Sequence, residues 1–217
     1  MRKAFDEAVD APRPAGAHLL VFARVPALGQ VKTRLAAGVG APAALAIYLE
    51  LLGITRAAIV EAGVPVTVWL AGTAGPVPTA AEANDWPGMP ARCQPAGDLG
   101  QRMTAAFAAA FAAGATRVAI IGTDCPGLEP AHLTRAFALL DEHEVVLGPA
   151  TDGGYYLLGL RQPQPELFRH KAWSTASVLA DTLADARRLG RRVALLPELH
   201  DVDTAADLAT WRPGTLA

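Results

Sequence analysis

The stretch Arg117-Val118-Ala119-Ile120-Ile121 runs directly into Gly122-Thr123-Asp124-Cys125-Pro126, and this junction decides the fold class. Its first five residues are almost continuously apolar, which is typical of a central strand buried on both faces of a sheet. Ligands of open α/β sheets gather at the carboxyl ends of such strands, where Asp124 lies. A carboxylate there suits Mg²⁺ or Mn²⁺, which take one or two carboxylates plus substrate phosphates. An Asx turn leading into a following helix explains Asp124 equally well.

Apolar runs of strand length recur on both sides of this junction and alternate with helix-like segments. The predicted strands cover residues 18–23, 65–70, 117–121, 144–147, 155–160 and 192–196, and the predicted helices cover 42–61, 98–113, 130–141, 175–189 and 204–211. This α/β alternation favours a mostly parallel sheet with helices on both faces. Only residues 150–153 separate two of the strands, which is too short for a parallel crossover, so we expect a mixed sheet. Residues 71–91 are the expected loop-rich insertion.

Length and composition bound the class of protein. The chain has 217 residues, a net charge of −2 and 52% hydrophobic residues, many of them alanine. We expect a flexible tail over residues 1–16 and a single domain over residues 17–217. The lack of a basic block disfavours nucleic-acid binding. No apolar stretch of the ~18 residues that span a membrane is evident, nor is a secretory signal.

The two cysteines, the spacing of the histidines and the absence of three known sequence motifs limit the reactions that the chain is expected to catalyse. Cys93 and Cys125 are lone thiols that indicate a reducing cytoplasm, with a disulfide between them as the alternative. Cys125 adjoins Asp124 but has no nearby base in the sequence, so an inert packed thiol is favoured over a nucleophile. The histidines have no metal-ligand spacing, and G-x-S-x-G, GxxxxGK[ST] and GxGxxG are absent.

A Pro/Gly loop with three cations follows the first predicted strand. Residues 23–35 read Ala-Arg-Val-Pro-Ala-Leu-Gly-Gln-Val-Lys-Thr-Arg-Leu and carry Arg24, Lys32 and Arg34. Backbone N–H groups and fixed cations in such a loop suit a polyphosphate. A solvated surface loop is the alternative.

Four further segments carry candidate residues, each with a structural alternative. Asp152-Gly153-Gly154 combines a carboxylate with backbone that a ligand can approach, and it also fits a hairpin turn. Asp98 and Arg102 open a helix, where they contact a nucleotide or cap the helix. The acids of Asp201-Val202-Asp203 supply a metal ligand, or Thr204 caps the last helix with Asp207. Trp173-Ser174-Thr175 lines an acceptor pocket, or Trp173 packs in the core.

Four of these motifs, in order, resemble one bacterial family. They are residues 22–35, Gly122-Thr123-Asp124-Cys125-Pro126, residues 147–156 and Trp173-Ser174-Thr175. The family is the glycosyltransferase-like family associated with radical-SAM genes, also described as arsenosugar biosynthesis glycosyltransferase. With its relative 2-phospholactate guanylyltransferase, it belongs to the GT-A superfamily of nucleotide-diphospho-sugar transferases. The resemblance covers residues 18–211 and implies a single-domain GT-A fold.

The resemblance also implies roles for individual residues. Asp124 corresponds to the metal carboxylate, Asp203 can complete the Mg²⁺ or Mn²⁺ site, and Asp152 lies near the acceptor or shares the metal. Arg24, Lys32 and Arg34 would face the phosphates of the nucleotide. Together with the motifs themselves, this makes Asp124, Asp152 and Lys32 the candidate catalytic residues. The candidate nucleotide-binding residues are Arg24, Gly29, Lys32, Arg34, Asp98 and Arg102, and the candidate acceptor-binding residues are Gly153, Gly154, Trp173 and Ser174.

Three functions follow as hypotheses. The leading one is a metal-dependent transferase that moves a group from an NDP-sugar donor to a small-molecule acceptor. The second is a nucleotidyltransferase that joins an NTP to a phosphate- or carboxylate-bearing acceptor and releases pyrophosphate. The third is a nucleotide-binding module without catalysis.

Overall fold

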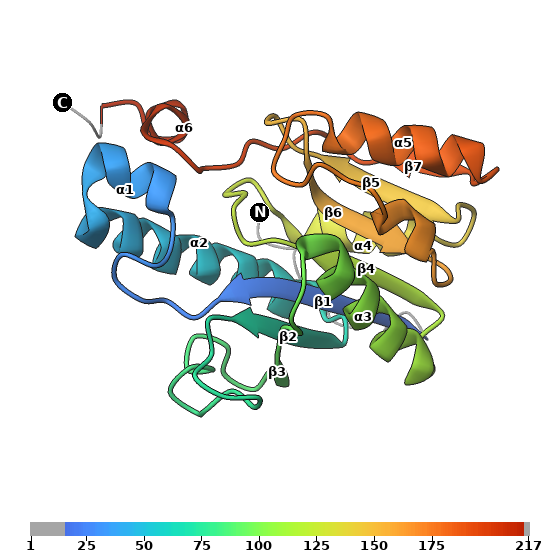
Figure 1. Cartoon of the computed structure of the whole chain (residues 1–217), viewed down its shortest axis with the longest axis horizontal. Helices are drawn as coiled ribbons and strands as arrows, with labels where there is room; N and C mark the ends of the chain where they lie inside the picture. The colour runs from blue at the N-terminus through green and yellow to red at the C-terminus, as the bar shows by residue number, and fades with distance from the viewer. Residues whose placement is uncertain (1–15, 215–217) are drawn as a thin grey trace, which may run out of the picture.

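The computed structural model describes residues 16–214, which fold around one seven-stranded sheet (Figure 1). The strands are β1 (Ala17–Arg24), β2 (Val66–Ala71), β3 (Ala91–Cys93), β4 (Arg117–Ile121), β5 (Val145–Pro149), β6 (Tyr155–Leu160) and β7 (Val193–Leu195). Their order across the sheet is β3-β2-β1-β4-β6-β5-β7. β6 runs antiparallel to β4 and β5, whereas the other neighbouring strands pair in parallel. The predicted mixed, mostly parallel sheet is therefore confirmed.

Helices cover both faces of the sheet, as predicted (Figure 1). They are α1 (Thr33–Val39), α2 (Ala41–Ala62), α3 (Leu99–Ala112), α4 (Pro130–Leu139), α5 (Val178–Arg188) and α6 (Ala205–Trp211), with a 3₁₀ helix, η1 (Pro165–Phe168). Alternate residues of β1 enter opposite cores, because successive side chains of a strand point to opposite faces. Leu19 and Val21 pack with α2 and α4, while Leu20 packs with α3, η1 and α5. A third cluster joins α1, α2 and α6.

Three elements were not predicted from the sequence: the strand β3, the helix α1 and the short 3₁₀ helix η1. β3 has three residues at the end of the expected insertion, too few for an apolar pattern. α1 begins inside the expected cationic loop, directly after Lys32. Of the expected tail, residues 1–15 lie outside the described residues. Gly16 is held in place, because its carbonyl oxygen accepts hydrogen bonds from the backbone N–H groups of Thr116 and Arg117 at 2.8 and 3.1 Å.

The expectation about membrane-length apolar stretches was wrong for one helix. α2 has 22 residues, and an 18-residue window within it has a mean hydropathy of 1.8 and few charges, so by length and composition it is long enough to cross a membrane. Tyr48, Leu51, Leu52 and Ile59 are buried against the sheet and α1, whereas Leu49 and Val60 are exposed. A core helix accounts for this pattern, because the buried side is apolar and the exposed side carries apolar residues as well.

An ion pair joins the edge strand β7 to β5, and it should depend on pH. Glu144 accepts hydrogen bonds from the backbone and guanidinium of Arg192, which lower its pKa to about 2. A depressed carboxyl pKa adds stability above the unfolded value, and that stability is lost as the pH falls from about 4.5 toward 2. Glu144→Gln should therefore lower the free energy of unfolding at pH 7 by about 1 kcal/mol or less. Urea unfolding of both proteins at pH 7 and pH 3 measures this, and a difference that persists undiminished at pH 3 would contradict it.

Candidate functional site

A cleft of about 510 Å³ opens at the carboxyl ends of β1, β2 and β4. That volume is typical of sites for small molecules and cofactors. Most of the predicted site residues line it: Arg24, Lys32, Arg34, Arg102, Asp124, Asp152, Gly154, Trp173, Ser174 and Asp203. Gly29, Asp98 and Gly153 are not among the lining residues. The topology thus brings together segments from the first, middle and last thirds of the chain.

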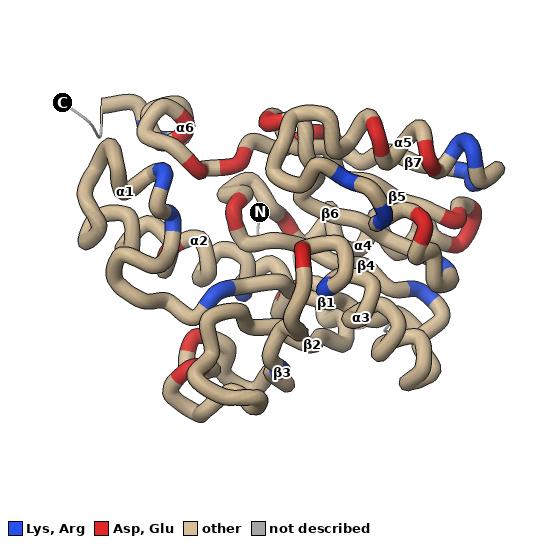
Figure 2. The backbone as a smooth tube through the Cα atoms, in the orientation of Figure 1, with Lys and Arg blue, Asp and Glu red and all other residues tan. Residues whose placement is uncertain are grey.

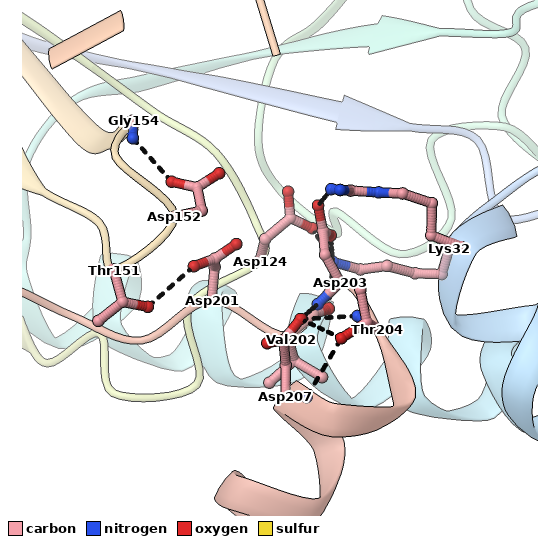
Figure 3. Close-up of polar contacts among 11 residues, drawn as sticks. Lys32, Asp124, Thr151, Asp152, Gly154, Asp201, Val202, Asp203, Thr204 and Asp207 are labelled. Atoms are coloured by element: carbon pink, nitrogen blue, oxygen red, sulfur yellow. Dashed lines mark hydrogen bonds and ion pairs between the residues drawn. The ribbon is translucent and has the colours of Figure 1, made fainter. Parts of the chain in front are cut away.

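Lys32 lies at the centre of the polar contacts in this cleft (Figure 3). Its ammonium forms an ion pair with Asp124, a second ion pair with Asp203 Oδ1 at 2.8 Å, and a hydrogen bond to the carbonyl oxygen of Val202 at 2.8 Å. Lys32 precedes α1 in a left-handed conformation with φ 47°. A non-glycine residue rarely adopts this backbone conformation, and such residues cluster at functional sites.

The charges of this cluster shift one another's pKa values. Burial alone would lower the pKa of Lys32, but Asp124 and Asp203 outweigh it and raise that pKa, so the ammonium stays charged at neutral pH. Burial would likewise raise the pKa of Asp203, yet Lys32 and Arg34 hold it below its usual value. The Lys32 side chain is only 5% exposed, whereas that of Asp124 is 46% exposed to the cleft.

Two arginines extend the positive side of the cleft. Arg34, 66% exposed in its side chain, forms an ion pair with the second oxygen of Asp203. In Figure 2, basic positions at the start of α1 face acidic positions in the segment before α6, which agrees with these ion pairs. Arg24 ends β1, and its backbone is fixed by Tyr48, whose hydroxyl accepts from the Arg24 N–H at 2.8 Å and donates to the Arg24 carbonyl oxygen at 3.1 Å.

The Asp152 turn combines both interpretations that the sequence allowed. The N–H of Gly153 donates to the carbonyl oxygen of Ala150 at 3.0 Å, which closes the turn between β5 and β6. The Asp152 carboxylate accepts from the Gly154 N–H at 2.8 Å and still lines the cleft. Asp201 lies nearby (Figure 3), and burial together with the charge of Asp152 raises its pKa. The turn therefore places a further acid, Asp152, beside the cluster formed by Lys32, Asp124 and Asp203.

Two other predicted segments have clear structural roles. Asp98 caps α3, because its side chain accepts from the Gln101 N–H at 2.8 Å and the Gln101 side chain accepts from the Asp98 N–H at 2.9 Å. The Arg102 guanidinium donates to the Gly97 carbonyl oxygen at 2.8 Å. Trp173 packs so closely on α3 that a Cβ at Gly100 would lie 2.7 Å from its ring. Both Arg102 and Trp173 still line the cleft.

Cys125 also lines the cleft, as the inert thiol that the sequence favoured. Burial, with the nearby charge of Asp124, raises the pKa of this thiol far above neutral. A thiol that stays protonated is a poor nucleophile. Cys93 and Cys125 are both free, so the alternative of a disulfide does not hold.

Two polar residues that line the cleft, Tyr48 and Gln94, lie outside every motif that the sequence analysis singled out. The amide nitrogen of Gln94 donates to the carbonyl oxygens of Ala23 and Trp69 at 3.3 and 3.0 Å, which ties the segment after β3 to β1 and β2. Neither residue belongs to a motif. Gln94 follows a strand that the pattern did not predict, and Tyr48 belongs to a helix whose apolar face explains it without a site.

The carboxylates fit a divalent cation that substrate phosphates help to hold. One oxygen of Asp124 and one of Asp203 contact the same atom, Lys32 Nζ, so both converge on one cation-sized position. Within residues 16–214, no group of three or more His, Cys, Asp or Glu side chains is arranged to hold a metal ion. Mg²⁺ is usually bound by one or two carboxylates together with phosphates and waters, so two acids suffice.

This sheet, with its helices on both faces and a cleft at its carboxyl edge, defines the α/β fold of the nucleotide-diphospho-sugar transferases. Residues 55–175 match the family described as "Uncharacterized protein conserved in bacteria (DUF2064)", and the chain belongs to this family. No curated protein matches the chain in sequence.

Solved structures share the fold over nearly the whole chain. A protein from Desulfovibrio desulfuricans, described as a candidate nucleotide-diphospho-sugar transferase, is 30% identical, with a TM-score of 0.84 over 92% of this chain and 88% of its own. The inositol-1-phosphate CTP transferase of T. maritima is 14% identical, with a TM-score of 0.57 over 88% and 90%. A Mycobacterium tuberculosis protein in complex with manganese is 17% identical, with a TM-score of 0.56 over 92% and 99%.

Proposed function

We propose that the protein is a Mg²⁺- or Mn²⁺-dependent transferase that takes an NDP-sugar donor and passes the activated group to a small-molecule acceptor. One observation carries this proposal: the lysine that follows the first strand contacts the acid at the end of the central strand, Asp124, inside one cleft. The resemblance to the candidate nucleotide-diphospho-sugar transferase of Desulfovibrio desulfuricans supports it.

Each group in the cleft has a role in this reaction. Asp124 and Asp203 would hold the metal, which when bound supplies positive charge to the diphosphate. Lys32, Arg34 and Arg24 would bind the phosphates and stabilise the negative charge that builds on the leaving diphosphate. Asp152, held by the Gly154 N–H, would face the acceptor and take its proton.

The remaining candidate residues keep the roles predicted for them from the sequence. Gly154, Trp173 and Ser174 line the far side of the cleft, where we propose that the acceptor binds, with Gly153 shaping the turn. Arg102 would contact the nucleotide, with Gly29 and Asp98 acting through the loop and the helix start that they form. The association with radical-SAM genes and the cytoplasmic location remain predictions from the sequence.

Nucleotidyl transfer is the second candidate, and it would use the same pair of acids. Asp203 and Asp124 contact the same ammonium, so both carboxylates are available for either reaction. The resemblance to 2-phospholactate guanylyltransferase includes Asp203. The two reactions differ in product, because an NDP-sugar releases an NDP whereas an NTP releases pyrophosphate.

We expect at least one of UDP, GDP, CDP and ADP to bind about tenfold more tightly with Mn²⁺ than without it, because a metal held by Asp124 and Asp203 would supply positive charge to the diphosphate. Titration calorimetry of the four nucleotides measures this. Arg34→Met should weaken the binding, whereas Arg188→Met, which removes an arginine of similar exposure from an ion pair outside the cleft, should not. The absence of binding by every nucleotide, with and without Mn²⁺, would exclude the proposed function.

A further inference from the structure

The ammonium of Lys32 has no hydrogen-bond donor left for a phosphate. An ammonium carries three N–H donors. In this structure they meet Asp124, Asp203 and the carbonyl oxygen of Val202, and the side chain is 5% exposed. Lys32 can therefore bind a diphosphate only if it gives up at least one of these partners.

The position that Lys32 Nζ occupies is also the position where Asp124 and Asp203 converge. Two cations cannot share it, since an ammonium and a divalent ion there would repel each other strongly at such short range. The same two carboxylates that would hold the metal are thus already paired with a cation of the chain itself.

The Lys32 ammonium can leave without creating a buried, unpaired carboxylate. Asp203 keeps a partner, because its second oxygen is paired with Arg34. The Asp124 side chain is 46% exposed to the cleft, so it remains partly hydrated. Lys32 is the residue directly before α1 and lines the cleft, so its ammonium lies beside the space that a nucleotide would occupy.

We infer that Lys32 acts as an internal cation that holds Asp124 and Asp203 together in the nucleotide-free protein and turns to the donor's phosphates when nucleotide and metal bind. This inference rests on the proposed function and specifies how its site is regulated. Lys32 is then a positioning residue for the metal site as well as a phosphate ligand.

A linkage between the two ligands follows. Nucleotide phosphates offer Lys32 a new partner, which frees the carboxylates for the metal, and by reciprocity the metal favours nucleotide binding to the same degree. If Lys32 occupies the shared position in nine of ten nucleotide-free molecules, the apparent metal affinity is lowered about tenfold.

The test measures Mn²⁺ binding in the absence of nucleotide. The electron paramagnetic resonance signal of free Mn²⁺ reports how much of the metal remains unbound. Lys32→Met removes the internal cation and keeps the length of the side chain, so it should tighten nucleotide-free Mn²⁺ binding about tenfold. Arg34→Met removes the same charge but leaves Lys32 between the carboxylates. Because Arg34 is largely exposed and screened, its effect should stay below about threefold.

A second variant keeps the inference testable if Lys32→Met does not fold. Lys32→Gln retains hydrogen-bond donors for Val202 and Asp203 without the charge, and it should tighten Mn²⁺ binding in the same direction. Circular dichroism establishes which variants are folded. In either variant, added nucleotide should raise the Mn²⁺ affinity less than it does in the unaltered protein.

The outcomes separate this inference from the function on which it rests. Equal or weaker nucleotide-free Mn²⁺ binding in folded Lys32 variants, alongside nucleotide-dependent Mn²⁺ binding in the unaltered protein, would overturn the inference and leave the function standing. Tightening by Arg34→Met as large as that by Lys32→Met would also overturn it, since general electrostatics would then explain both. If the unaltered protein binds no Mn²⁺ even with nucleotide, the proposed function itself fails.

Discussion

Asp124→Asn is expected to lower turnover at least about a hundredfold in a protein that still folds. Metal-assisted charge stabilisation is worth several kcal/mol, and each 1.4 kcal/mol is about tenfold in rate. Asparagine keeps the shape of the side chain, and Lys32 keeps Asp203 and Val202 as partners, so the fold should persist. Release of NDP or pyrophosphate measures turnover, and urea unfolding measures stability.

The matched control for Asp124→Asn is Asp185→Asn. Asp185 also pairs with a buried lysine, Lys171 at 2.6 Å, and with an exposed arginine, but it does not line the cleft. Its loss should affect stability and leave turnover unchanged. Full turnover by folded Asp124→Asn, or an equal loss of turnover in the control, would rule out the assignment of Asp124 to the metal site.

Gly153→Ala is expected to lower the free energy of unfolding by about 2 to 5 kcal/mol, from backbone strain and from overpacking. Gly153 has φ +86°, a conformation that alanine rarely adopts. In addition, the new Cβ would lie 2.3 Å from the carbonyl oxygen of Ala176, and that oxygen belongs to backbone that cannot rotate away. Because the turn must shift, Asp152 moves with it, and turnover should fall as well. Urea unfolding and product release measure the two effects.

Gly190→Ala separates the collision from the backbone strain. Gly190 has φ +66°, also left-handed, but a Cβ there would meet nothing within 4 Å. Its substitution should therefore cost only about 1 kcal/mol, with turnover unchanged. Equal destabilisation of the two variants would mean that the contact with Ala176 adds nothing to the cost.

The fold could be predicted because its signals are local and repeated. Long apolar runs at 117–121 and 155–160 fill the two central strands, and the capping residues Asp98 and Thr204 start helices where expected. β3 could not be predicted in this way, because a three-residue strand at the sheet edge is set by pairing with β2 and not by its own pattern.

The candidate site was predictable only as separate motifs. The segments with Lys32, Asp124 and Asp203 each carried a chemical signal, but their contact spans 171 residues and depends on α1 and α6 packing side by side on α2. The left-handed conformation of Lys32 has no signature in the sequence. Tyr48 and Gln94 enter the cleft through tertiary packing alone, so no spacing rule points to them.

The reversed direction of β6 brings a short hairpin to the same edge of the sheet as the end of β1. β6 runs antiparallel to β4 and β5, so it starts at the edge of the sheet where those two strands end. A turn of a few residues therefore places Asp152 at this edge, whereas a parallel strand would need a long crossover connection. The hairpin that carries Asp152 is therefore separate in the chain from β1 and the segment after it, which carry Arg24 and Lys32. In the proposed reaction, changes of length or sequence at the tip of this hairpin would alter the choice of acceptor while the groups that bind the donor stay the same.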